Sequence, residues 1–470
     1  MGTVEGPSRR TSISTPPRDE PFSHGILDED EGSRRALKMY LKPVVGATVM
    51  IWLVIWSVLA LYWGANWKVF SGLHNLDGWV VDFDGGIIGS TVISAYMNAT
   101  GAKEQISWHV IPASEFPGGE ADLPKAVLGE KCWIAVSISS GASDRLSAAI
   151  ASANTSYDNS AAVTLWGNEA RNENAYSFFL EQQLEGPMPE AIAAFALQQS
   201  QQLGSNADSL LRTAPKLVLS PLNYTLVNLK PFDIQVATAV DFVGLIYLLI
   251  LSFIAALANF QARVMISGID RRLRFKQLLI LRFVAPFTIY FWLSFVFSLL
   301  SLFFKVPFDR KFGHAGFFIY WMLSWSGMLA LGLSLEAMIT LLTPRFIPFF
   351  LVLWIIVNVS VVFFPVEILP TIFRYGYATP FYNVGNATRT ILFGTRNQVG
   401  LNFGVLFAWI GISLITIPLF QGLVRRGQVK EWRKKMGAEQ NRQVEEKQRR
   451  MSSGDDATSS AGTQVEVSEV

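Results

Sequence analysis

Residues 363–396 read FFPVEILPTIFRYGYATPFYNVGNATRTILFGTR and connect two long apolar stretches. The segment is too rich in aromatic and aliphatic side chains to be a solvated loop. Pro365, Pro370 and Pro380 break any single helix, because proline lacks a backbone N–H and clashes with the preceding turn. Irregular backbone is stable at membrane depth only where protein buries it. The segment 366–400 therefore predicts short re-entrant elements that dip into the outer leaflet and pack against a helical bundle.

The composition of the 470-residue chain is also that of a membrane protein. Half of the residues are hydrophobic and 16% are charged, whereas soluble domains carry about 25% charged residues. The net charge of +2 says little about partners, and we expect no nucleic acid among them. Cys132 is the only cysteine, which excludes a disulfide and a cysteine-based zinc site. The four histidines have no metal-ligand spacing, so we expect no metal and no cofactor.

Six stretches are apolar enough, over about 20 residues, to cross a bilayer as helices. They cover about 43–65, 236–258, 278–304, 315–342, 346–365 and 401–424. The first is expected to be an uncleaved signal anchor. Residues 1–42 and 425–470 are then tails. The first tail is expected to be mostly disordered, and the second to continue the last helix to about residue 450, with a disordered end.

Lysine and arginine favour the cytosolic side of a membrane span. They are dense between the second and third spans and after the sixth, for example at Arg271, Arg272, Arg425 and Arg426. Both termini are therefore expected in the cytosol, and residues 66–235 on the other side. We expect the plasma membrane, with another membrane of the secretory route as the alternative.

Four acceptor sequences for N-linked glycans agree with this orientation. Each lies in a part of the chain expected outside the cytosol, and their asparagines are Asn98, Asn154, Asn223 and Asn386. Because such tripeptides also arise by chance, they support the topology without proving it.

The segment 66–235 predicts an α/β domain, because short apolar runs alternate in it with helical patterns. Strands are expected at 78–84, 107–112, 132–139, 161–167 and 224–233. Helices are expected at 87–99, 142–154 and 174–213, the last with a break at 185–190. Ser143 or Asp144 is the expected N-cap of the second helix.

Asp82 and Asp84, in VVDFDGG (80–86), resemble the signature of haloacid-dehalogenase phosphatases. Such an enzyme also needs a downstream lysine and an acidic pair that holds magnesium. The adjacent aspartates Asp455 and Asp456 lie in the C-terminal tail, on the wrong side of the membrane. Acidic residues at a strand end commonly cap the following helix, and we favour that reading. The chain also lacks a P-loop, an H-E-x-x-H sequence and a G-x-S-x-G sequence, so we expect no catalytic residues.

Ionisable residues inside spans are costly and are functional candidates by default. Glu336, in LGLSLEAMIT, and Arg282 lie near the same ends of two neighbouring spans and could pair. The alternative is a packing ion pair near the membrane surface, or an Arg282 side chain that extends to that surface while Glu336 faces a hydrated crevice. Asp241 lies near the outer end of the second span and is expected to be interfacial.

The segment after the fifth span resembles the permeases of type-2 ABC exporters. There, a proline, an acidic residue and a Leu-Pro pair lead into a re-entrant hairpin, and an arginine precedes the last span. The matching residues here are Pro365, Glu367, Leu369, Pro370, Pro380, Tyr382 and Arg389. With VVDFDGG, FPVEILP, YGYATPFYN and ILFGTRNQVGLNFGVL, residues 40–425 resemble the fungal nitrosoguanidine-resistance membrane proteins. This resemblance implies six spans, an extracytosolic domain after the first, and a link to resistance to toxic compounds.

Three functions follow as hypotheses. The first is transport or redistribution of hydrophobic compounds or lipids, with Glu336, Arg282, Asp241, Glu367 and Arg389 as candidate residues. The second is a non-transporting scaffold or regulator whose outer domain binds partners. The third, an outward-facing phosphatase that uses Asp82, has the least support. Membrane lipids are the expected partners. The permease resemblance adds a homodimer and a separate ATPase subunit, although no residue pattern supports that subunit.

Overall fold

A computed structural model describes residues 30–204 and 206–459. The chain divides into two units, residues 1–58 and residues 59–470. In the first, α1 (Glu31–Val54) begins at Asp30, whose carboxylate accepts a hydrogen bond from the Ser33 N–H at 2.7 Å. This cap satisfies one of the free N–H groups of the first turn. The predictions for residues 1–29 lie outside the described residues.

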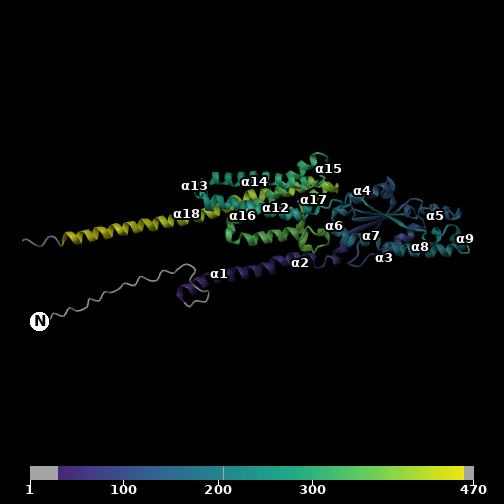
Figure 1. Cartoon of the computed structure of the whole chain (residues 1–470), viewed down its shortest axis with the longest axis horizontal. Coiled ribbons are helices and arrows are strands. Elements are labelled where there is room, and N and C mark those ends of the chain that lie inside the picture. Colours follow the sequence, from purple (N-terminus) through teal and green to yellow (C-terminus); the bar gives the residue numbers. More distant parts are fainter. Residues whose placement is uncertain (1–29, 205, 460–470) are drawn as a thin grey trace, which may run out of the picture. The chain divides into compact units, whose positions relative to one another are not determined.

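Within the described residues, five helices are long and apolar enough to cross a membrane (Figure 1). They cover Glu31–Asn66, Thr238–Ile266, Phe275–Phe303, Ala315–Leu342 and Val399–Gln448. The elements in these ranges are α1, η1 (Ile55–Leu59), α2 (Ala60–Asn66), α11 (Thr238–Asp241), α12 (Val243–Phe260), η8 (Gln261–Ile266), α14 (Phe275–Phe303), α16 (Ala315–Val359) and α18 (Val399–Ser459). Short helices α13 (Ile269–Arg272) and α15 (Asp309–Phe312) lie between them. The helix of α18 continues past residue 450, where the sequence predicted disorder.

The helix at the position of the predicted fifth span differs from the prediction. Its helical part is Pro344–Val359, shorter than the predicted 346–365, and it belongs to α16. Tyr320, near the start of α16, stacks on Phe308, and Glu336, further along, accepts a hydrogen bond from Arg263 after the end of α12. Asn358, near the end of α16, bonds to the segment 380–393, which also contacts Asp241 of α11, so the end of α16 lies on the side where α11 begins. The chain therefore reverses within α16, and the prolines at 344 and 348 interrupt its backbone hydrogen bonds there.

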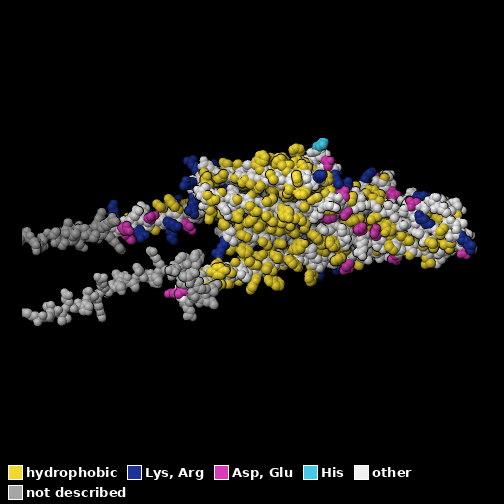
Figure 2. Space-filling model, in the orientation of Figure 1, with side chains coloured by type: hydrophobic (Ala, Val, Ile, Leu, Met, Phe, Trp, Pro, Cys, Tyr) yellow, Lys and Arg dark blue, Asp and Glu magenta, His cyan; other side chains and the backbone are white. Residues whose placement is uncertain are grey.

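The surface of the bundle is apolar. Hydrophobic side chains cover its long helices in Figure 2, and Phe303, Ile415 and Trp292 are among the exposed ones. An apolar surface of this extent is unusual for a soluble protein and suits contact with lipid. α16 is the central helix, because 67% of the residues in an apolar 18-residue stretch of it are buried, compared with 22% in the corresponding stretch of α14.

A five-stranded mixed sheet follows α2 in the chain. Its strands are β1 (Asp77–Asp82), β2 (Ser107–Ile111), β3 (Ile134–Ile138), β4 (Val163–Gly167) and β5 (Tyr224–Asn228), in the order β2-β1-β3-β4-β5. The pairs β1–β2, β1–β3 and β4–β5 are parallel, and β3–β4 is antiparallel. A strand is present in each of the five predicted stretches, but β5 ends at Asn228 instead of residue 233. Every residue of β3 is buried, as its continuous apolar run requires.

Helices of several lengths connect and cover the strands. They are η2 (Phe70–Asn75), α3 (Ile87–Asn98), η3 (Ala113–Glu115), η4 (Gly119–Asp122), α4 (Leu123–Leu128), α5 (Ala142–Ala151), η5 (Asn159–Ala161), η6 (Glu169–Arg171), α6 (Glu173–Ala175), η7 (Tyr176–Leu180), α7 (Glu181–Glu185), α8 (Met188–Leu203), α9 (Asn206–Thr213) and α10 (Lys216–Leu219). The predicted break at 185–190 falls between α7 and α8, where Gly186 and Pro187 separate the two helices.

The aspartates after β1 organise the loop and the next helices. The Asp82 carboxylate accepts hydrogen bonds from the N–H groups of Asp84 and Gly85, at 2.9 and 3.0 Å. Asp84 accepts from the Ser143 N–H at 2.9 Å, at the start of α5. The predicted N-cap of α5 was wrong: the N-cap is Gly141, and Asp84 supplies the missing acceptor from another part of the chain. Both carboxylates thus have structural contacts.

The segment that opened the sequence analysis forms three short helices. They are η9 (Val366–Ile368), η10 (Thr371–Ala378) and α17 (Pro380–Phe393). All residues of α17 except Tyr382 and Asn386 are buried. Asn358 of α16 accepts a hydrogen bond from the Phe381 N–H at 3.2 Å, which satisfies a donor at the start of α17.

Candidate functional site

Two clusters of buried charges lie within the second unit. The first, which we call the bundle cluster, consists of Arg263, Asp270, Arg282, Glu336, Thr340 and Gln421. The second, the junction cluster, consists of Glu173, Asp241 and Arg389. Together they contain four of the five charged residues that the sequence singled out.

Glu336 is the centre of the bundle cluster. Its side chain is fully buried, and its Oε1 accepts hydrogen bonds from Arg263 Nη1 at 2.7 Å and from Arg282 Nε at 3.2 Å. Its Oε2 is buried without a hydrogen-bond partner. A buried carboxylate oxygen without a donor is costly, and it is also a place where a proton can bind.

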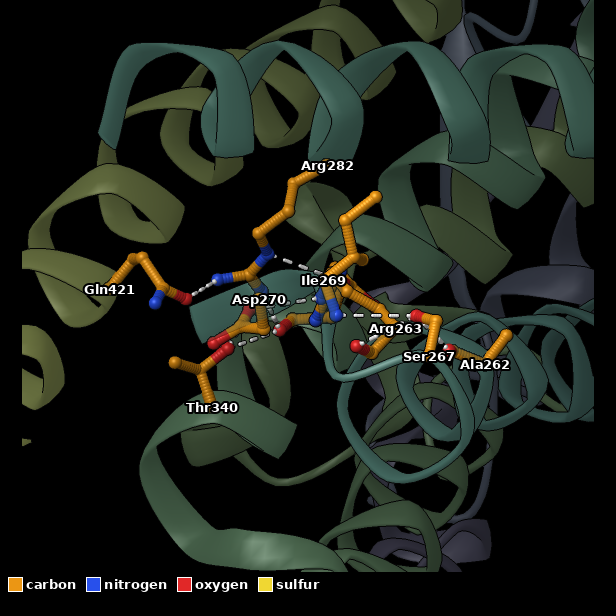
Figure 3. A network of polar contacts seen from close by, with 9 residues as sticks. Ala262, Arg263, Ser267, Ile269, Asp270, Arg282, Thr340 and Gln421 are labelled. Carbon is orange, nitrogen blue, oxygen red and sulfur yellow. Dashed lines mark hydrogen bonds and ion pairs between the residues drawn. The ribbon is translucent and has the colours of Figure 1, made fainter. Parts of the chain in front are cut away.

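Arg282 joins three helices at this point. Its Nη1 donates to Gln421 Oε1 at 2.6 Å, and its Nη2 donates to Thr340 Oγ1 at 2.7 Å and to the Glu336 carbonyl at 2.8 Å. These residues belong to α14, α16 and α18, and Figure 3 shows their side chains converging. Buried guanidinium groups need this degree of hydrogen bonding to offset the loss of water.

Arg263 completes the cluster and was not predicted as part of it. Besides Glu336, it pairs through Nε with Asp270 Oδ1 at 3.3 Å. Arg263 follows the predicted second span, 236–258, and the π-helical turn η8 extends α12 so that this side chain is buried in the bundle. The formal charges of two arginines and two carboxylates then cancel.

The junction cluster connects the sheet domain to the membrane helices. Arg389 of α17 donates through Nε to Asp241 Oδ2 at 3.0 Å and through Nη2 to Glu173 Oε2 at 2.9 Å. Asp241 is fully buried in the protein, near the start of the second long helix. α17 covers it, and Gly385 permits this approach: a Cβ there would lie 3.1 Å from the Asp241 carbonyl oxygen.

The charges of the junction cluster do not cancel. Two carboxylates share one guanidinium, and Asp241 Oδ1 is buried without a partner. Like charges at one buried site disfavour full ionisation. The arrangement can therefore accept a proton without creating a net positive charge.

A small cavity of about 60 Å³ lies beside the junction cluster. Glu130, Arg171, Glu367, Tyr382 and Arg389 are among its lining residues. The Arg171 guanidinium lies 3.4 Å above the Trp133 ring and donates to the Cys132 carbonyl at 3.0 Å. The cavity is thus polar, charged and enclosed by both the sheet domain and the segment around η9 and α17.

Burial changes the ionisation of the groups around this cavity. It raises the pKa of Glu130 and lowers the pKa of Arg171, and in each case the nearby opposite charges act against the effect of burial. Burial also raises the pKa of the Cys132 thiol to about 12, so this cysteine is protonated at neutral pH and is not a nucleophile.

The other predicted residues have separate positions. Pro365 lines the cavity with Glu367 and Tyr382. Pro370 is exposed before η10, and Pro380 is the first residue of α17, a position where proline is favoured because its N–H is not needed. The structure therefore does not bring Pro370 into either charge cluster.

The four glycan acceptor sites differ in exposure. Asn98, Asn154 and Asn223 are exposed on the sheet domain. Asn386 lies in α17, and the hydroxyl residue of its acceptor sequence, Thr388, is fully buried. In the part of the chain that the structure describes, no group of three or more His, Cys, Asp and Glu side chains has the arrangement of a metal site.

Long apolar helices with buried, mutually paired charges define a polytopic α-helical membrane protein, here with an attached mixed sheet. Residues 47–415 match the family described as "Protein of unknown function (DUF3533)", and the chain belongs to that family. It is also 32% identical over 200 residues to the uncharacterized endoplasmic reticulum membrane protein YJR015W of Saccharomyces cerevisiae. That match covers 42% of this chain and 39% of the relative. No solved structure matches the chain.

Proposed function

We propose that the protein moves, or helps to redistribute, hydrophobic compounds or lipids in a membrane, with a bundle like that of the type-2 exporters. The observation that carries the proposal is Glu336, a fully buried carboxylate with one free oxygen between two arginines of an apolar bundle. Ionisable groups in such positions mark ion and substrate pathways by default. The resemblance to the nitrosoguanidine-resistance proteins extends the proposal to tolerance of toxic compounds.

The junction cluster supplies a mechanism for this movement. Protonation of Asp241 or Glu173 would weaken the hold of Arg389 on one of its two partners, since the proton neutralises one carboxylate. α17 would then be free to shift relative to α11 or to the sheet domain. In this proposal a proton gradient is the energy source, and no catalytic residue is involved.

The proposed topology has six spans, with both termini in the cytosol and the sheet domain on the opposite side. The five long helices and the shorter Pro344–Val359 helix would supply the spans. The basic residues around α13 and after residue 424 favour this orientation. The endoplasmic reticulum relative supports a secretory-route membrane, with the plasma membrane as the other location.

Glycosylation tests the topology directly. Asn98, Asn154 and Asn223 are exposed and are the acceptors that this orientation makes available, whereas Asn386 is half-buried and Thr388 of its acceptor sequence is fully buried. Glycosidase treatment should increase the gel mobility of the protein, and Asn154→Gln should remove one step of that change. Asn386→Gln, the matched control, should leave it unaltered. If glycosidase left the mobility unchanged and the face that carries the termini were protected from protease, the orientation would be the reverse of the proposed one.

Flux tests the function. The purified chain is reconstituted in liposomes, and a fluorescent phospholipid and a hydrophobic toxicant are followed with and without a proton gradient. Transport predicts flux that depends on the gradient and that Glu336→Gln abolishes while the variant remains folded. If the folded protein gives no flux under either condition, proton-driven transport by this chain alone is excluded.

The alternative function is a scaffold or regulator whose sheet domain binds partners. One observation favours it: the sheet domain exposes the large hydrophobic side chains of Phe178, Leu197 and Leu219, and exposed apolar surface can bind a protein partner. The discriminating experiment is partner capture. Under this alternative, proteins that co-purify with the whole chain are lost when the exposed surface of the sheet domain is altered, and they persist in Glu336→Gln.

Two partners belong to the same proposal. A homodimer would resemble the paired six-span halves of related permeases. A separate ATPase subunit would replace the proton gradient as the energy source. Purification in mild detergent, with the mass of the complex measured, separates a monomer, a dimer and a larger assembly.

A further inference from the structure

A groove with basic walls lies where α18 leaves the apolar part of the bundle. It has a volume of about 570 Å³, and its lining residues include Phe275, Arg425, Arg426, Val429, Lys430 and Arg433. Sites for small ligands commonly have volumes of about 300–1,000 Å³. The groove is therefore large enough for a phosphorylated head group.

The charge in this groove is of one sign. Four of its lining residues are lysine or arginine, and none is acidic. A neighbouring groove of about 320 Å³ shares Arg425 but also contains Asp270 and Glu431. The first groove therefore differs from an ordinary mixed surface of this helix, because its positive charge has no carboxylate in the lining to balance it.

Arg425 is positioned as a ligand-binding group would be. Its Nη2 donates to the Leu273 carbonyl at 2.9 Å, which holds the guanidinium at the start of α14. Its Nη1 is buried and has no hydrogen-bond partner in the protein. An unpaired buried donor is costly, and a phosphate oxygen is the acceptor that a guanidinium binds best.

The groove also lies at the end of an apolar helical stretch. The apolar stretch of α18 ends at Val424, directly before Arg425. Figure 2 shows lysine and arginine side chains gathered at that end of the hydrophobic surface. Phe275 and Val429 add apolar contacts among the cations. This combination matches a phospholipid, whose phosphate groups adjoin its acyl chains at the edge of the hydrocarbon layer.

We propose that this groove binds the head group of an anionic phospholipid that carries at least one phosphomonoester, such as a phosphoinositide. Four cations exceed what a singly charged head group needs, and clusters of basic residues directly outside a span bind polyanionic lipids. The site is independent of the proposed transport function, because binding requires neither flux nor a particular energy source.

The test uses the full chain in nanodiscs of neutral phospholipid with a small fraction of a fluorescent phosphoinositide. Arg426→Gln combined with Lys430→Gln removes two exposed cations and leaves Arg425 in place. Each cation near an anionic surface contributes roughly fivefold in affinity, so we expect a loss of about twentyfold. Adding Arg425→Gln should increase the loss to about a hundredfold.

The matched control removes charges from the same helix outside the groove. Arg442→Gln combined with Lys447→Gln changes the net charge equally and should alter the affinity by less than about twofold. Equal losses in the double variant and in this control would overturn the groove as a specific site. Inorganic phosphate or a soluble inositol phosphate that binds as tightly as the lipid would overturn the lipid as the ligand. Thermal unfolding of each variant verifies that it is folded.

Discussion

The bundle cluster and the junction cluster are both built around buried arginines, but they differ in what they connect and in their charge. In the bundle cluster, Arg282 and Arg263 meet two carboxylates, and all partners belong to the bundle helices and to the short turn after α12. In the junction cluster, Arg389 alone meets two carboxylates, one of which comes from the sheet domain. One cluster is neutral and internal, and the other has an excess negative charge between two parts of the protein.

This difference separates two roles for the same residue type. A neutral cluster in which each arginine meets a carboxylate stabilises one arrangement of the helices, because breaking it leaves buried charges without partners. In a cluster where two carboxylates share one guanidinium, full ionisation is disfavoured, so that uptake of a proton can change the contacts as a switch requires. We therefore expect variants of the bundle cluster, whose Glu336 the proposed transport also requires, to have the larger effect on stability. Variants of the junction cluster should act mainly on the coupling of the sheet domain to the bundle.

Arg282→Ala should have the largest effect. It removes four hydrogen bonds to three residues and leaves Glu336 and Gln421 without this partner. Loss of one partner of a buried ion pair costs about 3–5 kcal/mol. The measurement is the unfolding midpoint in detergent. Arg274→Ala, an exposed position just before the same helix, should change the stability by less than about 0.5 kcal/mol. Equal effects of the two variants would contradict the role of the cluster.

Glu336→Gln should have the next largest effect on stability. The amide retains the shape and one acceptor but removes the charge that two arginines share, so we expect a loss of about 2–3 kcal/mol, the value of a hydrogen bond to a charged group. A double-mutant cycle with Arg263→Met measures the coupling, expected at about 1–3 kcal/mol for residues in contact. Additive effects of the two substitutions would show that the pair has no energetic coupling.

Arg389→Gln should have a smaller effect on global unfolding but a specific effect on the junction. Without the arginine, Asp241 and Glu173 face each other, and the attachment of the sheet domain weakens. We expect the connection between β5 and α11 to be cleaved faster by protease, by about tenfold, which corresponds to about 1.4 kcal/mol of local opening. Asp233→Asn, which removes an exposed ion pair with Arg310, is the control and should leave this rate within about twofold. Unchanged cleavage in Arg389→Gln would mean that the cluster does not attach the domain.

Glu130→Gln should have the smallest effect, visible only as a change in pH dependence. Burial raises the pKa of Glu130 in the folded protein above its unfolded value. The folded state then binds the proton more readily, so the contribution of Glu130 to stability is greatest below the unfolded pKa and is lost as the pH rises through the folded pKa. The unfolding midpoints of the two proteins should be close near pH 4. At pH 7 the midpoint of the variant should be the higher one, and a constant difference across this range would contradict the shift.

Much of the fold could be predicted because its signals are local. Apolar length identifies the long helices, alternation of strand and helix patterns identifies the sheet domain, and prolines divide 363–396 into short elements. The pairing of Arg282 with Glu336 was also predictable, since both lie at corresponding depths of neighbouring spans. The end of the predicted stretch 346–365 differs, because the helix of α16 ends at Val359 and the following segment forms η9 and η10.

The sequence by itself thus determined which segments are helices, strands and buried connectors, and which charges occur where apolar residues dominate. Only the tertiary structure decided how those charges are partnered. Arg389 and Glu173 are 216 positions apart, and Asp84 caps a helix 59 positions away. Arg263 entered the bundle through a turn that hydropathy does not distinguish from a loop. The physical reason is that hydrophobicity and backbone propensity act between neighbours along the chain, whereas ionic partners depend on which faces of distant elements meet.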